Sequence, residues 1–534
     1  MSDFYPRPSF KRDSYFPLTK GEIVFNDGSR QNINLPFAPE SQLSGVKYEF
    51  GKVREYKYEI PFTLPEDFIK DRVLLHIGAV RQIATVFING SKVAEHKDAY
   101  SSIDVDITEH LKKDNLITVE VYCDTLDFSF PYGKQRGKRG GMWYTDISGI
   151  WQSVWLESVY DGYIKDVKIS TTLNSVYMNF DGISDGEILL DSKTYLIEGG
   201  ECDIKIENPV LWTPENPHLY YFTVTSGKDK IESYFALRTI EVKDNKLLLN
   251  EKPYFFHGVL DQGYFEKGIL TPESPTDYKE DILKMKSLGF NMIRKHIKIE
   301  PQIFYYYCDK YGMAVFQDMV NNGKYSFFFD TALPTVGFLR KNDRRIHKNL
   351  TDRENFISCM KSAVEKLSNH PSIVQWTIFN EGWGQFCADD MHDLMILCDP
   401  SRPIDSASGW FKANNTDFDS RHIYFRKLKA KKSDKPLFIS EFGGITYKVD
   451  GHTFGENTYG YGKAKTREEF KNALRNLYEN QVIPLKKEGL CATVYTQLCD
   501  VEDEINGLLT YDRQVMKILP EEFNDISERL IYEE

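Results

Sequence analysis

The hydrophobic pattern of the chain changes near residue 158 and again near residue 242. Before residue 158, short runs of branched and aromatic residues alternate with turn residues, which is typical of antiparallel β-structure. The predicted strands are residues 55–62, 72–77, 84–88 and 117–123, with a hairpin turn at Asn89-Gly90. This pattern predicts a jelly-roll domain over residues 1–158.

A second β-rich stretch covers residues 159–242. Its expected strands are residues 163–170, 176–181, 219–225 and 231–242. Both its length and its short, turn-separated strands fit one immunoglobulin-like β-sandwich.

From residue 243 onward, strands alternate with helices. Predicted helices include residues 276–288, 301–311, 352–368 and 467–486. Eight strands are expected, at residues 254–259, 291–296, 314–318, 374–380, 403–406, 422–424, 437–441 and 492–497. Eight such units over residues 243–534 predict a (β/α)8 TIM barrel, whose active site lies at the C-terminal ends of its strands. Polar residues at those ends are therefore the candidates for chemistry.

Composition narrows the range of partners. A net charge of -12 gives no electrostatic attraction to nucleic acid or to an anionic membrane. The first residues lack a secretory signal, and no run reaches the roughly 18 apolar residues of a membrane span, so we expect a cytoplasmic protein.

The eight scattered cysteines form no CxxC pair and the 11 histidines no HExxH motif, so we expect neither a metal nor another cofactor. The sequence leaves open whether the protein forms a homo-oligomer.

Two glutamates follow buried strands at equivalent places in the barrel. Glu381 follows Asn380 at the end of the fourth strand, and Glu441 ends the seventh. A single glutamate at such a place could simply cap the following helix. Two of them, on strands that face each other across the barrel, match the carboxyl pair of a glycosidase. Gly382 and Gly443 lie close behind and are expected to leave room for a ligand.

Four longer strings carry a family resemblance. They are LPFAPESQLSG at residues 35–45, GMWYTDISGIWQSVWLE at 141–157, HPSIVQWTIFNEGWGQ at 370–385 and ISEFGG at 439–444. With them the whole chain resembles glycoside hydrolase family 2, the β-galactosidases, β-glucuronidases and β-mannosidases of clan A. The resemblance implies that Glu381 is the acid/base, Glu441 the nucleophile, and Asn380 a partner of the sugar 2-hydroxyl. The order within the pair rests on the resemblance alone.

Other residues at strand ends are predicted to bind the carbohydrate substrate. The resemblance favours Tyr424, because a strand-six tyrosine positions the nucleophile in clan A. An arginine, an aspartate and a histidine at one barrel mouth would also fit a structural ion-pair network, and the two tryptophans would also fit a domain interface. The full set is Asp261, Arg294, His296, Asp318, Trp383, His422, Tyr424, Gln497 and, from the first domain, Trp143.

The basic residues of segment 134–139 lie among glycines. Lys134, Arg136, Lys138 and Arg139 are therefore expected to form a mobile loop that is able to fold over the site. Most such charge runs are simply solvated.

The expected activity is that of a retaining exo-β-glycosidase, with a β-D-galactoside as the preferred substrate. Family glucuronidases hold the uronate with an Asn-x-Lys motif after the nucleophile strand, and residues 442–489 contain no such triplet. A β-glucuronidase, an α-L-arabinopyranosidase and a non-catalytic carbohydrate-binding relative remain as alternatives. The sequence does not separate hydrolysis from transglycosylation.

Overall fold

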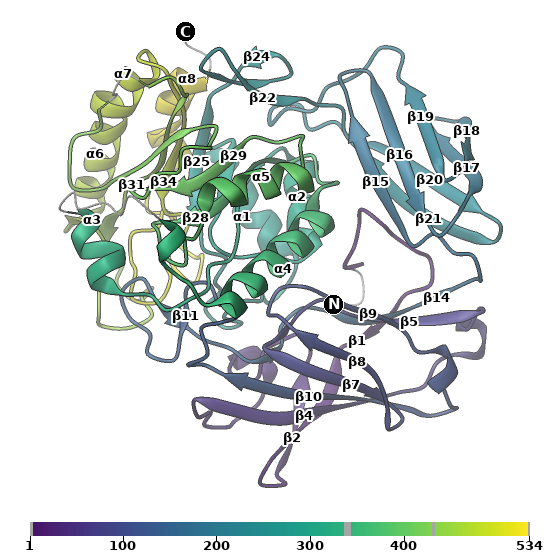
Figure 1. Ribbon diagram of the computed structural model, residues 1–534. Helices are drawn as coiled ribbons and strands as arrows, with labels where there is room; N and C mark the ends of the chain where they lie inside the picture. Colours follow the sequence, from purple (N-terminus) through teal and green to yellow (C-terminus); the bar gives the residue numbers. More distant parts are fainter. Residues whose placement is uncertain (1–3, 336–342, 430–432, 532–534) are drawn as a thin grey trace.

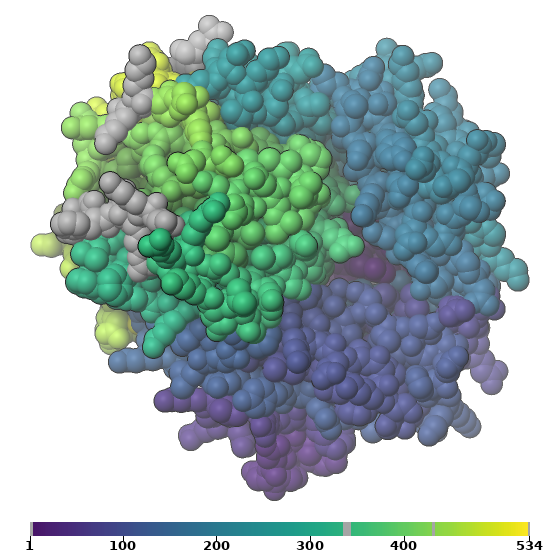
Figure 2. All heavy atoms as spheres, in the orientation of Figure 1, coloured from purple at the N-terminus to yellow at the C-terminus, as the bar shows by residue number. Residues whose placement is uncertain are grey.

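The computed structural model describes residues 4–335, 343–429 and 433–531 and arranges them as two β-rich parts and a barrel (Figure 1). In the view of Figure 1 the N-terminal part lies below the barrel and the second part beside it. The same three lobes are visible in the space-filling view of Figure 2. This is the predicted fold class.

The N-terminal part is a sandwich of two antiparallel sheets around a core of aliphatic and aromatic residues. Asn89 and Gly90 both have positive φ, 51° and 88°, as the expected hairpin turn requires. One sheet has the order β3-β2-β4-β10-β7-β8, with β2 Lys20–Phe25, β3 Arg30–Asn34, β4 Val53–Phe62, β7 Ile83–Ile88, β8 Ser91–Lys97 and β10 Asn115–Asp124. The other has the order β1-β14-β5-β9, with β1 Phe16–Leu18, β5 Arg72–Ile77, β9 Ile103–Asp106 and β14 Val154–Val159.

The second part is one strongly curled ladder of seven strands in the order β15-β16-β19-β18-β17-β20-β21. The predicted strand 231–242 is in fact two strands, and the second of them, β22, joins a separate small sheet with β23 and β24. Strands β17 to β19 were not predicted. Strand β18 is almost wholly exposed and carries little alternation, whereas β19 alternates and was missed. Their bounds are β15 Asp166–Thr171, β16 Ser175–Asp181, β17 Asp185–Leu190, β18 Lys193–Glu198, β19 Glu201–Lys205, β20 Tyr220–Ser226, β21 Asp229–Phe235, β22 Ile240–Lys243, β23 Lys246–Leu249 and β24 Lys252–Pro253.

The barrel consists of eight parallel strands in the order β29-β28-β27-β26-β25-β34-β31-β30, with β29 beside β30. All eight correspond to predicted strands, with ends displaced by a few residues. The strands are β25 Phe256–Asp261, β26 Met292–Lys295, β27 Ala314–Asp318, β28 Ile373–Asn380, β29 Ile404–Ser408, β30 Asp419–Ile423, β31 Leu437–Gly443 and β34 Leu490–Thr496. The surrounding helices are α1 Thr276–Ser287, α2 Gln302–Tyr311, α4 Leu350–Leu367, α5 Ala388–Cys398, α6 Arg467–Leu477, α7 Ile483–Lys486 and α8 Asn524–Ile531.

Barrel strands are covered on both faces, which explains their continuous apolar runs. Every residue of β28 and β34 is buried. Side chains alternate between the barrel interior and the helices, so a polar residue at a strand end faces one or the other according to its register. Within the described residues, no helix has the length and apolar character needed to cross a membrane.

The N-terminal part also contacts the barrel mouth directly. The hydroxyl of Tyr132 donates to the carbonyl of Gly323 at 2.9 Å, and the amide of Gly133 donates to the carbonyl of Asn321. Short strands β11 (Gln135–Arg136) and β12 (Tyr144–Thr145) pair in parallel within the same region. The two residues just before the expected mobile loop are therefore hydrogen-bonded to the loop after β27, and residues 135–136 of the expected loop pair with β12.

Candidate active site

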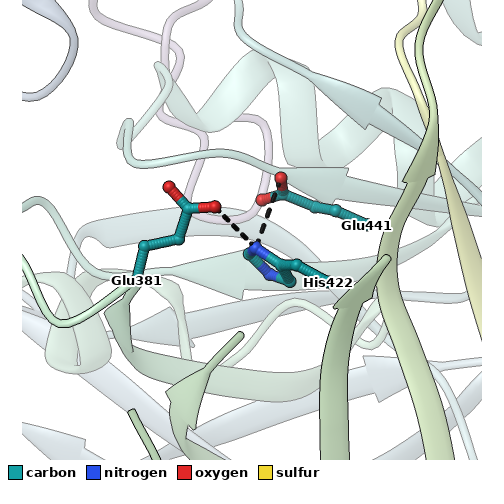
Figure 3. Close-up of side chains that lie close together, drawn as sticks. All are labelled: Glu381, His422 and Glu441. Atoms are coloured by element: carbon teal, nitrogen blue, oxygen red, sulfur yellow. Dashed lines mark hydrogen bonds and ion pairs between the residues drawn. The ribbon is translucent and has the colours of Figure 1, made fainter. Parts of the chain in front are cut away.

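Glu381 and Glu441 come together at the barrel mouth, with His422 between them (Figure 3). Glu381 follows β28, and Glu441 lies within β31. One oxygen of each carboxylate and Nδ1 of His422 all lie within 4.8 Å of one another. Figure 3 shows both carboxylates directed toward the same ring nitrogen.

The backbone around this pair is tightly constrained. Glu381 has a left-handed φ of 56°, a conformation that costs non-glycine residues energy and often marks functional sites. A Cβ on Gly382 would lie 2.0 Å from the Phe411 ring, and one on Gly443 would lie 2.4 Å from Tyr495. The glycines were expected to leave room for a ligand, but protein side chains fill that room. They are needed for close packing and positive φ.

Arg294 on β26 connects most of the predicted residues. It is fully buried, and its guanidinium donates to Asp318 Oδ1 at 3.0 Å, to Asn380 Oδ1 at 2.9 Å and to Glu441 Oε1 at 3.2 Å. It also donates to the carbonyl of Ser440 at 2.9 Å. One cation thus fixes side chains from the third, fourth and seventh strands.

Glu441 is held in its ionised form. Burial alone would raise the pKa of its carboxyl, but the charges of His422, His296 and Arg294 lower it to about 2. Of these, the guanidinium of Arg294 is the permanently charged contributor. The hydroxyl of Tyr424 also donates to Oε2 of Glu441 at 2.5 Å. Tyr424 in turn stacks on Tyr461, with ring centroids 3.7 Å apart.

His422 lies between the two carboxylates. Its Nδ1 lies 2.8 Å from Glu381 Oε1 and 3.5 Å from Glu441 Oε2. Its Nε2 lies 3.4 Å from Nη1 of Arg294. Ser408 contacts Nε2 at 2.9 Å. The three atoms are close enough to ligate a metal ion, but a cation beside the guanidinium of Arg294 would be repelled, so we assign the cluster no metal.

His296 and Asp318 form the floor of this arrangement. His296 Nδ1 contacts Asp318 Oδ2 at 2.8 Å and lies 3.9 Å from Glu441 Oε1. Burial would raise the pKa of Asp318, but Arg294 and His296 lower it. These contacts are those of an ion-pair network that also borders the carboxylate pair.

Two predicted residues lie apart from the pair. Asp261 bonds Lys295 Nζ at 2.5 Å, and Lys295 also bonds Glu300 at 2.9 Å on the helix side of the barrel. Gln497 donates to Asn506 at 2.9 Å, on the loop after β34. Neither is hydrogen-bonded to Glu381 or Glu441.

The two predicted tryptophans form an aromatic cluster beside the mouth. Their rings meet edge to face, with centroids 5.1 Å apart. The indole N–H of Trp383 donates to the carbonyl of Gly323 at 3.0 Å, and the guanidinium of Arg136 lies 3.8 Å from the centre of the Trp143 ring. The cluster therefore joins the N-terminal part to the barrel.

Several residues at the mouth were not predicted. Asp405 on β29 is fully buried near Arg294, and burial raises the pKa of its carboxyl to about 6. Glu504, on the loop after β34, accepts from the hydroxyl of Tyr144 at 2.5 Å and from Asn506 at 3.0 Å. A polar residue within a strand, or well beyond its end, is not marked in the sequence as part of a barrel-mouth site. The one available signal for Glu504 was the acidic stretch DVEDE in which it lies.

Comparison with known families agrees with this arrangement. Residues 240–515 match the TIM barrel domain of glycosyl hydrolases family 2, residues 31–135 match the glycosyl hydrolase 2 galactose-binding domain-like family, and residues 158–238 match a further family 2 domain. The chain belongs to glycosyl hydrolases family 2.

Individual family 2 relatives are distant. The chain is 26% identical over 419 residues to a β-galactosidase of Thermoanaerobacter pseudethanolicus, a match covering 71% of this chain and 52% of that protein. It is 25% identical over 468 residues to the β-glucuronidase of Homo sapiens, covering 73% and 68%. The chain thus spans about half the length of the galactosidase. Among solved structures, the β-D-glucuronidase of Dictyoglomus thermophilum superposes with a TM-score of 0.76 at 17% identity, covering 99% of this chain and 100% of that one.

The buried Arg294 network generates a stability prediction. Arg294→Met leaves the carboxylates of Asp318 and Glu441 buried without their cation, which typically costs about 3–5 kcal/mol. We expect a clearly lower midpoint of thermal unfolding at pH 7. The matched control is Arg30→Met, whose ion pairs with Glu22 and Glu59 are at the surface, where pairs contribute little.

The pH dependence of that difference follows from the lowered pKa values. The stability contributed by ionised Glu441 is fully present above its ordinary pKa of 4.5 and is lost as the pH falls through about 2. The gap between wild type and Arg294→Met should therefore narrow as the pH is lowered from 7 to 3. Equal destabilisation by both arginine variants at pH 7 would contradict the role given to Arg294.

Proposed function

We propose that the protein is a retaining exo-β-glycosidase that removes terminal sugars by double displacement. The observation that carries this proposal is the spacing of Glu381 and Glu441, whose nearest oxygens lie within 4.8 Å. Retaining enzymes have carboxyl groups about 5–5.5 Å apart, whereas inverting enzymes need about 6.5–9.5 Å to admit a water molecule. Residues 132–145 hydrogen-bond to the loops after β27 and β34 beside the mouth, which supports action on a terminal sugar.

The environments of the two glutamates support different roles. Glu441, with a pKa lowered to about 2, is ionised at neutral pH and suits the nucleophile. Glu381 is more exposed, at 16% of its side chain, and its Oε1 contacts His422. We assign the acid proton to Oε2, which points away from the histidine in Figure 3.

The reaction follows from these roles. Glu381 donates its proton to the glycosidic oxygen while a Glu441 oxygen attacks the anomeric carbon, and the bond to the leaving alcohol breaks. Glu381, now ionised, removes a proton from water, which attacks the same carbon and releases Glu441. Two inversions give net retention. Asn380, whose Oδ1 accepts from Arg294, is assigned to the sugar 2-hydroxyl on the family resemblance.

For the glycone we propose a neutral hexose, with a β-D-galactoside preferred. The absence of an Asn-x-Lys triplet in residues 442–489 supports this choice. A β-glucuronide and an α-L-arabinopyranoside are the alternatives. Intact placement of both carboxylates argues against a relative that only binds carbohydrate.

The division of roles predicts unequal effects of two variants. Glu441→Gln should abolish turnover of every glycoside, because no substrate can bypass the nucleophile. Glu381→Ala should largely spare the glycosylation step on activated aryl glycosides, whose leaving groups need no proton, while that step becomes much slower on alkyl glycosides. Pre-steady-state kinetics with leaving groups of graded pKa measure this step. Equal loss across leaving groups in Glu381→Ala would count against the assignment.

The glycone is tested by kcat/KM on matched nitrophenyl glycosides. We expect the wild-type protein to prefer the β-galactoside to the β-glucuronide, because an unpaired carboxylate is costly in a buried site. A clear preference for the glucuronide would overturn this choice and leave the retaining mechanism intact.

A further inference from the structure

Lys134 is a mostly buried residue beside the barrel mouth whose ammonium has no hydrogen-bonded partner among the described residues. The Lys134 residue as a whole is only 8% exposed. Within the described part of the chain, its ammonium makes no hydrogen bond or ion pair, and its nearest recorded neighbour is the Trp143 ring, with Nζ 5.8 Å from the centroid. Lys134 Nζ is not among the buried side-chain atoms that lack a partner, so it is accessible and its donors are free to bind a ligand.

The backbone holds Lys134 in place. The amide of Tyr144 donates to the Lys134 carbonyl at 2.9 Å, and the preceding Gly133 is bonded to Asn321 after β27. Gly133 has φ 63°, and a Cβ there would lie 2.9 Å from the carbonyl oxygen of Ile297, after β26. This close approach requires glycine. Lys134 is therefore fixed against the loops that follow the second and third strands.

Glu504 lies on the loop after β34, which pairs with β25, the neighbour of β26. It is 2% exposed, and two of the roughly four acceptor positions of its carboxylate are occupied by Tyr144 and Asn506. Burial raises the pKa of Glu504, while the hydrogen bond from Tyr144 and the charge of Lys134 oppose that rise. The charge of Lys134 also reaches His296, which borders Glu441. Tyr144 connects the two residues, because its amide donates to the Lys134 carbonyl and its hydroxyl donates to Glu504 Oε2 on the loop after β34.

We propose that Lys134 and Glu504 together bind hydroxyl groups of a neutral sugar, at the end of the site away from the anomeric carbon. The proposal rests on the proposed glycosidase function and names the side chains that select the glycone. An ammonium donates to a hydroxyl oxygen, and a carboxylate accepts from a hydroxyl hydrogen, so the pair suits adjacent hydroxyls. A uronate would gain Lys134 but would meet the negative charges of Glu504 and Glu441.

The test compares Lys134→Met and Glu504→Gln with wild type on nitrophenyl β-galactoside, its 6-deoxy analogue and its 4-epimer. Each variant should lower kcat/KM on the β-galactoside at least tenfold, as expected for a lost hydrogen bond to a charged group. On the substrate that lacks or inverts the contacted hydroxyl, the same variant should cost much less. Glu504→Gln should also narrow the discrimination against the β-glucuronide. The matched controls Lys138→Met, which is exposed on the same segment, and Glu502→Gln, which bonds the amide of Thr145, should stay within twofold of wild type.

The outcomes separate the two proposals. Ratios between substrates are measured on one preparation, so they do not depend on the folded fraction of a variant. The inference would be overturned if each variant lost the same factor in kcat/KM on every substrate, whichever hydroxyl the substrate lacks or inverts. So would a Lys134→Met variant that loses activity only on the glucuronide, because Lys134 would then be a uronate clamp. Failure of the wild type to hydrolyse any β-glycoside would instead refute the proposed function itself.

Discussion

The site depends on one buried guanidinium. Arg294 has no contact with solvent and must satisfy its donors inside the barrel, which it does with groups from the third, fourth and seventh strands. Parallel pairing sets Arg294 opposite Leu260 and Phe316, so its side chain points inward at the height where those strands end. Moving any of these strands by one residue would turn its polar group toward the helices and leave the cation unpaired. The register of the barrel strands therefore also determines the electrostatic environment of the carboxylate pair.

Much of this fold could be predicted because barrel strands are apolar on both faces and are separated by amphipathic helices. An apolar run such as 374–379 is best explained as a barrel strand. The glutamates that follow such runs were therefore expected at the barrel mouth. The face of each strand-end residue was harder to predict. Asp318 and Asp261 looked equivalent in the sequence, yet one faces Arg294 inside the barrel and the other faces Lys295 toward the helices. Alternation along a strand gives relative faces, but only the packed barrel shows which face is the interior.

Contacts between distant segments were the least predictable. Segment 134–139 has the glycines and positive charges of a solvated loop, and this was the expectation. Its contacts are ones that no local pattern reveals: residues 135–136 pair with β12, and Tyr132 and Gly133, just before the segment, donate to the carbonyls of Gly323 and Asn321. Backbone acceptors leave no trace in composition. The same holds for Glu504, which is bonded by a tyrosine 360 positions earlier in the chain.

For the proposed order of roles within the carboxylate pair, the structure adds physical support that the sequence lacks. Both glutamates end apolar strands, and only family resemblance distinguished acid/base from nucleophile. Their surroundings differ physically: Glu441 is reached by the guanidinium of Arg294 and the hydroxyl of Tyr424, whereas Glu381 contacts His422 and is partly exposed. A carboxyl group surrounded by donors and a fixed cation stays ionised, which supports the proposed nucleophile role of Glu441. Because His422 contacts both groups, it also holds them at the short separation that retention of configuration requires.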